Sequence, residues 1–208
     1  MTFFPAHVYP DQGTFALDYF ERYAQAAASV DPAAISRAGD LLRATVGLGR
    51  AIFSCGNGGS AAIANHLVCD CLKGTRAGTS IKPRVFSLST TIELITAIGN
   101  DIGYPEIFSY QMESNASQGD LLIAISSSGE SPNIIRALET ARELGMRSIA
   151  MVGFAGGAAA QLADVCLWVQ AENYGIVEDV HQSLMHIFAQ FLRLASTDAP
   201  EVLGTHYF

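Results

Sequence analysis

The spacing of apolar residues divides the chain into two parts. Between residues 11 and 30 apolar side chains recur with a roughly helical period, and Asp31-Pro32 then starts a second helix that runs to about Leu48. From Arg50 onward short apolar runs alternate with helical segments. With 208 residues, we predict one domain that consists of a helical extension over 1–49, an α/β core over 50–196 and a tail over 197–208.

Five short apolar runs predict β-strands, at residues 51–55, 84–88, 120–125, 147–152 and 165–169. The segments between and after them predict helices at residues 59–72, 91–98, 107–116, 132–144, 157–162 and 175–194. Strands that alternate with helices indicate a parallel sheet covered on both faces. The predicted fold class is therefore α/β, a doubly wound five-stranded parallel sheet with an N-terminal helical pair. Its ligands should bind outside the carboxyl ends of the strands.

Two strand-to-helix turns have the composition of anion sites. The first predicted strand runs into a glycine-rich turn, and the strand at 120–125 runs into a serine-rich one. A helix start offers unpaired N–H groups and a partial positive charge, and glycines let a phosphate approach the backbone. The candidate binding residues are Asn57, Gly58, Gly59 and Ser60 in the first turn, and Ser126, Ser127, Ser128 and Ser131 in the second.

Neither turn matches a known nucleotide loop. The first lacks the lysine of a P-loop, and Ala61 stands where the third glycine of G-x-G-x-x-G would fall. A single glycine-rich turn is more often an ordinary connection, and one serine would suffice to cap the second helix. Because both turns follow apolar strands, we favour a shared phosphorylated ligand. A further turn at Asn100-Asp101, closing a helix at Gly99, is either a plain chain reversal or a loop that contacts the sugar.

Four side chains have helical spacings that suit a metal ion. His66 and Asp70 are four residues apart, and Glu178 and His186 are eight apart, so each pair shares a helix face. Imidazole and carboxylate groups from two helices can converge on zinc or a similar ion. Taken singly, either histidine is more often a hydrogen-bonded packing residue. Asp179, His181 and His206 are expected at the surface or beside the site.

Composition narrows the classes of partner. A net charge of −8 without any Lys/Arg-rich run argues against direct binding of nucleic acid. Half of the residues are hydrophobic and only 15% are charged, which favours self-association. The chain starts without a signal-peptide pattern and no window is apolar enough for a membrane span. We expect a cytoplasmic protein whose four cysteines, Cys55, Cys69, Cys71 and Cys166, are reduced and mostly buried.

Several strings resemble the SIS-domain (sugar isomerase) family, and most closely the sedoheptulose 7-phosphate isomerases, or phosphoheptose isomerases. The resemblance covers about residues 10–195 and rests on the segments 54–60, 99–104, 119–131 and 178–181, together with His66, its acid four residues later, and His186. It implies a flavodoxin-like core in a homotetramer with active sites between subunits. It also implies a phosphate held by Ser60, Ser126, Ser128 and Ser131, with Ser127 where the isomerases usually have threonine.

The resemblance further implies a zinc site at His66, Asp70, Glu178 and His186. The acid at the Asp70 position would act as the base and the histidine at the His186 position as its acid–base partner. The isomerases have glutamate in place of Asp70 and glutamine in place of Glu178. The shorter aspartate withdraws its carboxylate by roughly 1 Å, which would slow proton transfer or change the substrate. Glu178 adds a negative charge near the metal and is an alternative base.

A third departure lies just before Glu178. The isomerases carry a basic and acidic sequence where this chain has Gly175-Ile176-Val177, so a sugar contact is expected to be lost.

Our leading hypothesis is a metal-assisted aldose–ketose isomerisation, in which sedoheptulose 7-phosphate becomes D-glycero-D-manno-heptose 7-phosphate through an enediolate. A second class is a non-catalytic SIS protein, which either senses a sugar phosphate or forms a tetramer that binds a replication initiator. A third is an isomerase of another sugar phosphate. Retention of both histidines and both carboxylates favours an enzyme.

Overall fold

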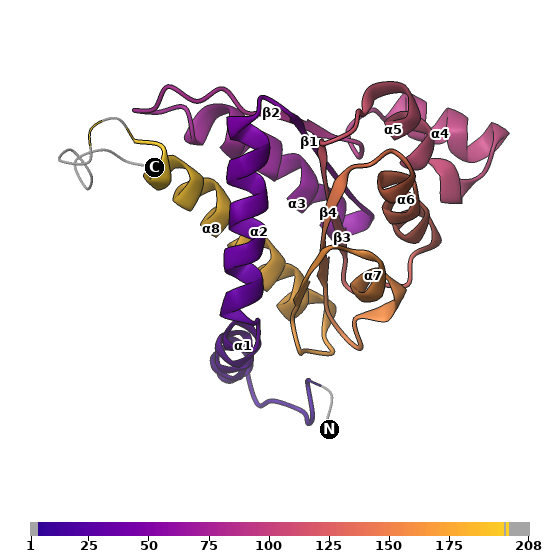
Figure 1. Ribbon diagram of the computed structural model, residues 1–208. Helices are drawn as coiled ribbons and strands as arrows, with labels where there is room; N and C mark the ends of the chain where they lie inside the picture. The colour runs from indigo at the N-terminus through magenta and orange to yellow at the C-terminus, as the bar shows by residue number, and fades with distance from the viewer. Residues whose placement is uncertain (1–3, 198, 200–208) are drawn as a thin grey trace.

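The chain forms a three-layer α/β fold in which helices cover both faces of a parallel sheet (Figure 1). The computed structural model describes residues 4–197 and 199. The strands are β1 (Ala51–Gly56), β2 (Arg84–Ser87), β3 (Leu121–Ser126), β4 (Arg147–Val152) and β5 (Val165–Trp168). The helices are α1 (Gln12–Ala28), α2 (Pro32–Gly47), α3 (Gly58–Cys69), α4 (Ile92–Asp101), α5 (Ser109–Asn115), α6 (Pro132–Glu143), α7 (Gly157–Leu162) and α8 (Tyr174–Ala195). A π turn, η1 (Asp70–Gly74), and a 3-10 turn, η2 (Tyr104–Glu106), complete the elements.

The sheet has the order β2-β1-β3-β4-β5 with all neighbours parallel, which confirms the predicted doubly wound sheet. In this order β1 and β3 are adjacent, and Gly56 at the end of β1 lies opposite Ile125 in β3. The glycine turn and the serine turn therefore leave the sheet side by side at its carboxyl edge. This is the place where parallel α/β sheets bind ligands.

Successive side chains along each strand point to opposite faces of the sheet, and so they contribute to two separate apolar cores. Ile123 and Ile125 of β3 pack with α2, α3 and α8, whereas Leu122 and Ala124 of the same strand pack with α5, α6 and α7. Figure 1 shows these two groups of helices on opposite faces of the sheet. The inner strands β1 and β3 are buried on both faces, which explains why they read as continuous apolar runs, whereas Phe86 of β2 and Trp168 of β5 are exposed at the edges.

The N-terminal helical pair is fastened to the last helix. Asp11 caps α1 by accepting a bond from Thr14 N, and Asp31 caps α2 through Ala33 N and Ala34 N. Tyr19 of α1 donates to Asp179 of α8 at 2.7 Å. The pair thus helps to fix the helix that carries His186.

Two local predictions are wrong. Helix α4 continues past Gly99, so Asn100 and Asp101 belong to its last turn, and the chain reverses instead at Gly103, whose φ is 144°. His181, expected at the surface or beside the site, is not at the surface but fully buried on the face of α8 that packs against the sheet. The helical period places it with the apolar side chains. His206 and most of the predicted tail lie outside the described residues.

The cysteines follow the expectation in part. Cys55 and Cys71 are buried, Cys166 is half-buried, and Cys69 is exposed. Burial raises the pKa of the Cys71 thiol to about 12, with a smaller contribution from the charge of Asp70, so it is a neutral packing group at neutral pH.

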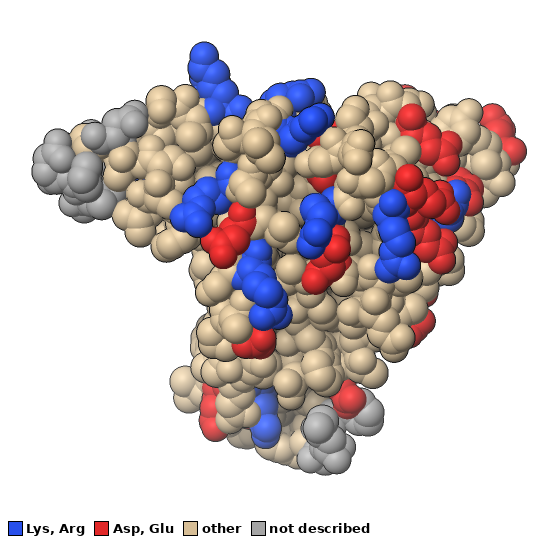
Figure 2. Space-filling view, viewed as in Figure 1, with Lys and Arg blue, Asp and Glu red and all other residues tan. Residues whose placement is uncertain are grey.

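On the face seen in Figure 2, most Lys and Arg side chains lie beside Asp or Glu. Arg136 of α6, for example, pairs with Glu106, Glu139 and Glu143. None of the helices within the described part of the chain is long and apolar enough to cross a membrane.

The burial of His181 predicts loss of stability in acid. Within the described part of the chain, neither ring nitrogen has a hydrogen bond of normal geometry. Burial lowers the pKa of His181 to about 4, and the nearby Val152 backbone acts weakly the other way. The unfolded chain protonates this residue near pH 6.5, so it binds more protons than the folded chain between pH 6.5 and 4. The free energy of unfolding should therefore fall by about 3 kcal/mol as pH falls through this window.

The measurement is urea unfolding at a series of pH values for the natural chain and for His181→Leu, which cannot take up a proton. The variant should lack this part of the acid-dependent loss. Parallel pH profiles for the two proteins would contradict the assignment.

Candidate active site

The glycine turn brings the start of α3 to the carboxyl edge of the sheet. Gly56 has no room for a side chain, because a Cβ there would lie 2.5 Å from the carbonyl oxygen of Ser60. Gly58 has a φ of 52°, a conformation that favours glycine. Ser60 is buried in the first turn of α3. The first N–H groups of this helix therefore lie where an anion can approach.

A pair of amides joins the two turns. Asn57 Nδ2 donates to Asn133 Oδ1 at 2.9 Å, and Asn133 Nδ2 donates back to Asn57 Oδ1 at 2.8 Å. Tyr104 Oη also donates to Asn57 Oδ1, at 2.9 Å. Because Asn133 is fully buried near the start of α6, this pair fixes the glycine turn relative to the serine turn.

The serine turn keeps hydroxyl groups free for a ligand. Ser126 Oγ accepts weakly from Gly129 N at 3.2 Å and lies 3.4 Å from Ser131 Oγ. Ser131 precedes α6 but its side chain does not cap that helix. Ser127 Oγ is buried and has no hydrogen-bond partner among the residues that the structure describes. A buried hydroxyl without a partner carries a cost that a bound anion would remove.

A cleft lies between these turns and the start of α8. It is lined by Asn57, Ser60, Ile125, Ser126, Ser127, Ser128, Ser131, Tyr174 and Glu178. Within the described chain no Lys or Arg lines it, so a phosphate there would be held by hydroxyl and backbone donors. The backbone of the serine turn packs closely against the Gly156 backbone, since a Cβ on Gly129 would lie 2.0 Å from the Gly156 carbonyl oxygen.

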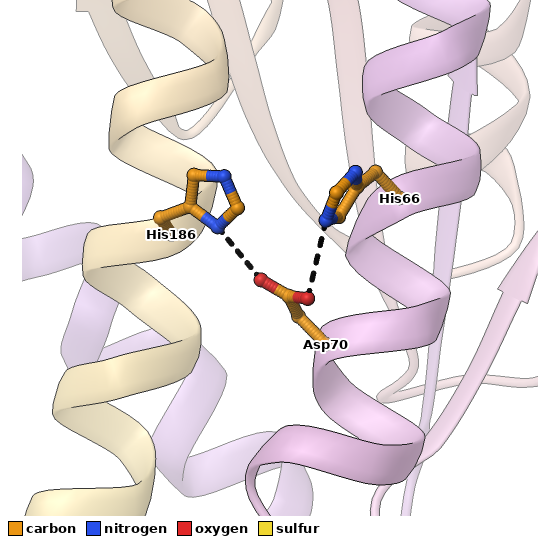
Figure 3. A group of neighbouring side chains, drawn as sticks. All are labelled: His66, Asp70 and His186. Atoms are coloured by element: carbon orange, nitrogen blue, oxygen red, sulfur yellow. Dashed lines mark hydrogen bonds and ion pairs between the residues drawn. The ribbon is translucent and has the colours of Figure 1, made fainter. Parts of the chain in front are cut away.

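The metal ligands predicted from helical spacing come together in part. His66, Asp70 and His186 form a group whose nearest ligand atoms all lie within 4.8 Å of one another. Asp70 stands between the histidines: His66 Nε2 lies 3.3 Å from its Oδ1, and His186 Nδ1 lies 2.8 Å from its Oδ2 (Figure 3). His66 comes from α3 and His186 from α8, whereas Asp70 begins the π turn that continues α3. π turns within helices are frequent at functional sites.

Glu178, the fourth predicted ligand, lies outside this group. Its carboxylate contacts Gly59 at the start of α3 and lines the cleft beside the serines. Burial raises the pKa of Glu178, and the charge of Asp179 adds to the effect. The eight-residue spacing does place Glu178 and His186 on one face of α8, but two helical turns apart, at the two ends of the site.

Asn100 and Asp101 do not join the cleft of the described chain. They are exposed at the end of α4 and bond to each other, with Asn100 Nδ2 donating to Asp101 Oδ1 at 2.7 Å. Their expected contact with the sugar remains a prediction. Tyr104, which follows them, reaches Asn57 instead.

The chemistry of the three-residue group fits a catalytic zinc ion. Two imidazoles and one carboxylate are a donor set that zinc commonly takes when a further position stays open for substrate. The exposed side-chain fractions are 48% for His66, 14% for Asp70 and 38% for His186, so a ligand can reach the group. No other set of three such donors is found among the residues that the structure describes.

Sequence reasoning missed three contacts at the site. Tyr104, Asn133 and Gln182 were not singled out, although each touches a predicted site residue. Only Gln182 had a usable signal, because it lies four residues before His186 on the same helix. The other two come from elements whose relative orientation the sequence does not give.

Comparison with known proteins gives the family. The model of the SIS domain matches residues 17–153. The phosphoheptose isomerase of Nitratidesulfovibrio vulgaris (strain Miyazaki F) is 38% identical over 146 residues, 70% of each chain. The solved phosphoheptose isomerase of Francisella tularensis superposes with a TM-score of 0.82 at 29% identity, covering 88% of this chain and 98% of that one. The solved phosphoheptose isomerase of Neisseria gonorrhoeae superposes with a TM-score of 0.79 at 31% identity, covering 87% of this chain and 97% of that one. The chain therefore belongs to the SIS-domain family, among relatives that are phosphoheptose isomerases.

Proposed function

We propose that this sugar-phosphate isomerase converts sedoheptulose 7-phosphate into D-glycero-D-manno-heptose 7-phosphate with the help of zinc. The family and its curated relatives make the chain an aldose–ketose isomerase. The proposed substrate and the role of zinc are supported by one observation: helix α3 connects the serine-lined cleft to the group of His66, Asp70 and His186.

The separation of these two sites supports a long sugar. Ser60 lies in the cleft, and His66 belongs to the group of His66, Asp70 and His186, called the metal group below. The two residues are six positions apart on α3, an axial rise of about 9 Å. An extended hexose or heptose phosphate spans a comparable length between its phosphate and its carbonyl carbon. A triose phosphate is too short to reach both sites at once.

At the phosphate end, neutral donors hold the ester. Ser127 Oγ, which has no partner in the described chain, would donate to a phosphate oxygen, and Ser126, Ser128 and Ser131 line the same cleft. The start of α3 would add backbone N–H donors through Gly58, Gly59 and Ser60.

At the carbonyl end, His66, Asp70 and His186 would hold zinc. A bound zinc ion would supply a Lewis acid that draws electron density from the carbonyl and hydroxyl oxygens of the substrate. Asp70 would move the proton between C1 and C2 by way of the enediolate. With zinc on His186 Nδ1 and Gln182 at its Nε2, neither ring nitrogen is free for the substrate, so Asp70 would carry the hydroxyl proton as well.

The placement of Glu178 favours Asp70 as the base. Glu178 contacts Gly59 at the phosphate end, about two helical turns from the metal group, so its carboxylate is poorly placed to reach C1 or C2. Glu178 remains the alternative base that the variants below distinguish.

A homotetramer with sites between subunits is part of the proposal. Large apolar side chains are exposed on α1 and α8, among them Leu17, Phe20, Ile187, Phe191 and Leu194. The side chains of α8 border a groove against α2 that begins next to His186, at Ile187. Apolar surface of this kind is typical of subunit interfaces.

Isomerase activity should depend on zinc and on Asp70. The purified protein with zinc should interconvert sedoheptulose 7-phosphate and its aldose, measured by NMR of the sugar. Asp70→Asn should reduce kcat at least about 10³-fold, because proton abstraction is lost, whereas Glu178→Gln should keep kcat within about 10-fold.

Sedoheptulose without the phosphate is the matched substrate control and should turn over poorly. Binding of sedoheptulose 7-phosphate without turnover would refute the heptose proposal. Loss of activity in Glu178→Gln but not in Asp70→Asn would show that Glu178, and not Asp70, is the base.

Removing the Ser127 hydroxyl should weaken binding of the sugar phosphate without lowering the stability of the fold. Ser127→Ala should weaken binding of the sugar phosphate by about 10-fold, since one donor is lost, while Tm stays equal or rises because an unsatisfied buried hydroxyl is gone. Calorimetric titration and thermal unfolding measure the two effects. Unchanged affinity would exclude Ser127 from the phosphate site.

Breaking the apolar face of α8 should change the assembly. Phe191→Glu should convert the tetramer into smaller species, measured by light scattering after size exclusion, because a charge would be buried at the interface. Gln190→Glu, at an exposed neighbouring position, is the control that should leave the tetramer intact. A natural chain that is monomeric at micromolar concentration would overturn the assembly proposal.

A further inference from the structure

Gln182 contacts the metal group from one helical turn away. On α8 it precedes His186 by four residues, so the two side chains share a face. Gln182 Nε2 lies 3.0 Å from His186 Nε2, and the other ring nitrogen, Nδ1, lies 2.8 Å from Asp70 Oδ2. The imidazole is therefore held at both nitrogens by two different elements.

The bonding groups define which nitrogen carries hydrogen. The Asp70 carboxylate only accepts, so His186 Nδ1 donates to it. The Gln182 amide nitrogen donates, so His186 Nε2 accepts with its lone pair. Without metal, this pattern describes a neutral ring with its hydrogen on Nδ1.

Metal binding would require the opposite arrangement. The nitrogen of His186 that faces Asp70 is Nδ1, and a nitrogen must lose its hydrogen to become a ligand. The hydrogen of the neutral ring then resides on Nε2, which needs an acceptor. Gln182 has one, because rotation of its amide exchanges the positions of nitrogen and oxygen.

We propose that Gln182 is a positioning residue that holds His186 Nε2 in both states, donating to it without metal and accepting from it when zinc is bound. This inference rests on the proposed zinc site. Partners of this kind fix the orientation and tautomer of ligating histidines, and their removal commonly costs 10- to 100-fold in metal affinity. Of the side chains near this length, only an amide can serve in both ways: glutamate only accepts and methionine offers no N–H or O–H donor.

The test compares Gln182→Met, Gln182→Glu and the control Gln190→Met, which lies two turns further along α8 and is exposed. Zinc affinity is measured by calorimetric titration against a competing chelator. Gln182→Met should lose at least about 10-fold in affinity. Gln182→Glu should retain it because an acceptor remains, and Gln190→Met should match the natural chain. Thermal unfolding checks that each variant is folded.

Nitrogen NMR of the His186 ring supplies a reading that does not need the metal. In the metal-free natural chain the hydrogen should lie on Nδ1, and the Nε2 shift should change in Gln182→Met as its donor is lost. With zinc, the hydrogen should lie on Nε2. An unchanged Nε2 shift, or unchanged zinc affinity in Gln182→Met, would overturn the proposal. If the natural chain binds no zinc, the metal site itself fails, while the metal-free spectra still decide whether Gln182 holds the ring.

Discussion

The site depends on one carboxylate that joins two helices. Asp70 lies where α3 passes into a π turn, and its two oxygens face His66 of α3 and His186 of α8. A charge that is mostly buried is tolerated only when such partners are present. Because α1 and α2 pack against α8, the position of His186 also depends on the N-terminal helices. The geometry of this group is therefore a property of the whole fold.

The parallel sheet fixes the other end of the site. Adjacent β1 and β3 deliver the glycine and serine turns to one edge, and the Asn57–Asn133 pair fastens them together. Helix α3 then spans from the cleft at Ser60 to the histidine–carboxylate group at His66. Because a helix is rigid, α3 fixes the distance between the two sites. In the proposed function, this distance selects sugar phosphates of matching length.

The sequence predicted those parts that local chemistry decides. Apolar runs gave the strands and their parallel arrangement, and the spacing of His66 and Asp70 gave a pair on one helix face that the structure brings together. Predictions failed where packing decides. His181 is polar by type but faces the core. Glu178 is on the predicted face of α8 and lines the cleft, and its role as a metal ligand stays a prediction. The contact between Asn57 and α6 depends on how two elements are oriented, which no single segment encodes.

In the proposed function, the cleft and the group of His66, Asp70 and His186 bind the two ends of one substrate. Diffraction at the zinc absorption edge from a crystal soaked with zinc and sedoheptulose 7-phosphate tests it most directly. An anomalous zinc peak is expected among His66, Asp70 and His186. The phosphate should lie at Ser126 to Ser131, with the sugar chain between the phosphate and the zinc. A zinc peak elsewhere, or a phosphate bound away from the serine turn, would contradict it.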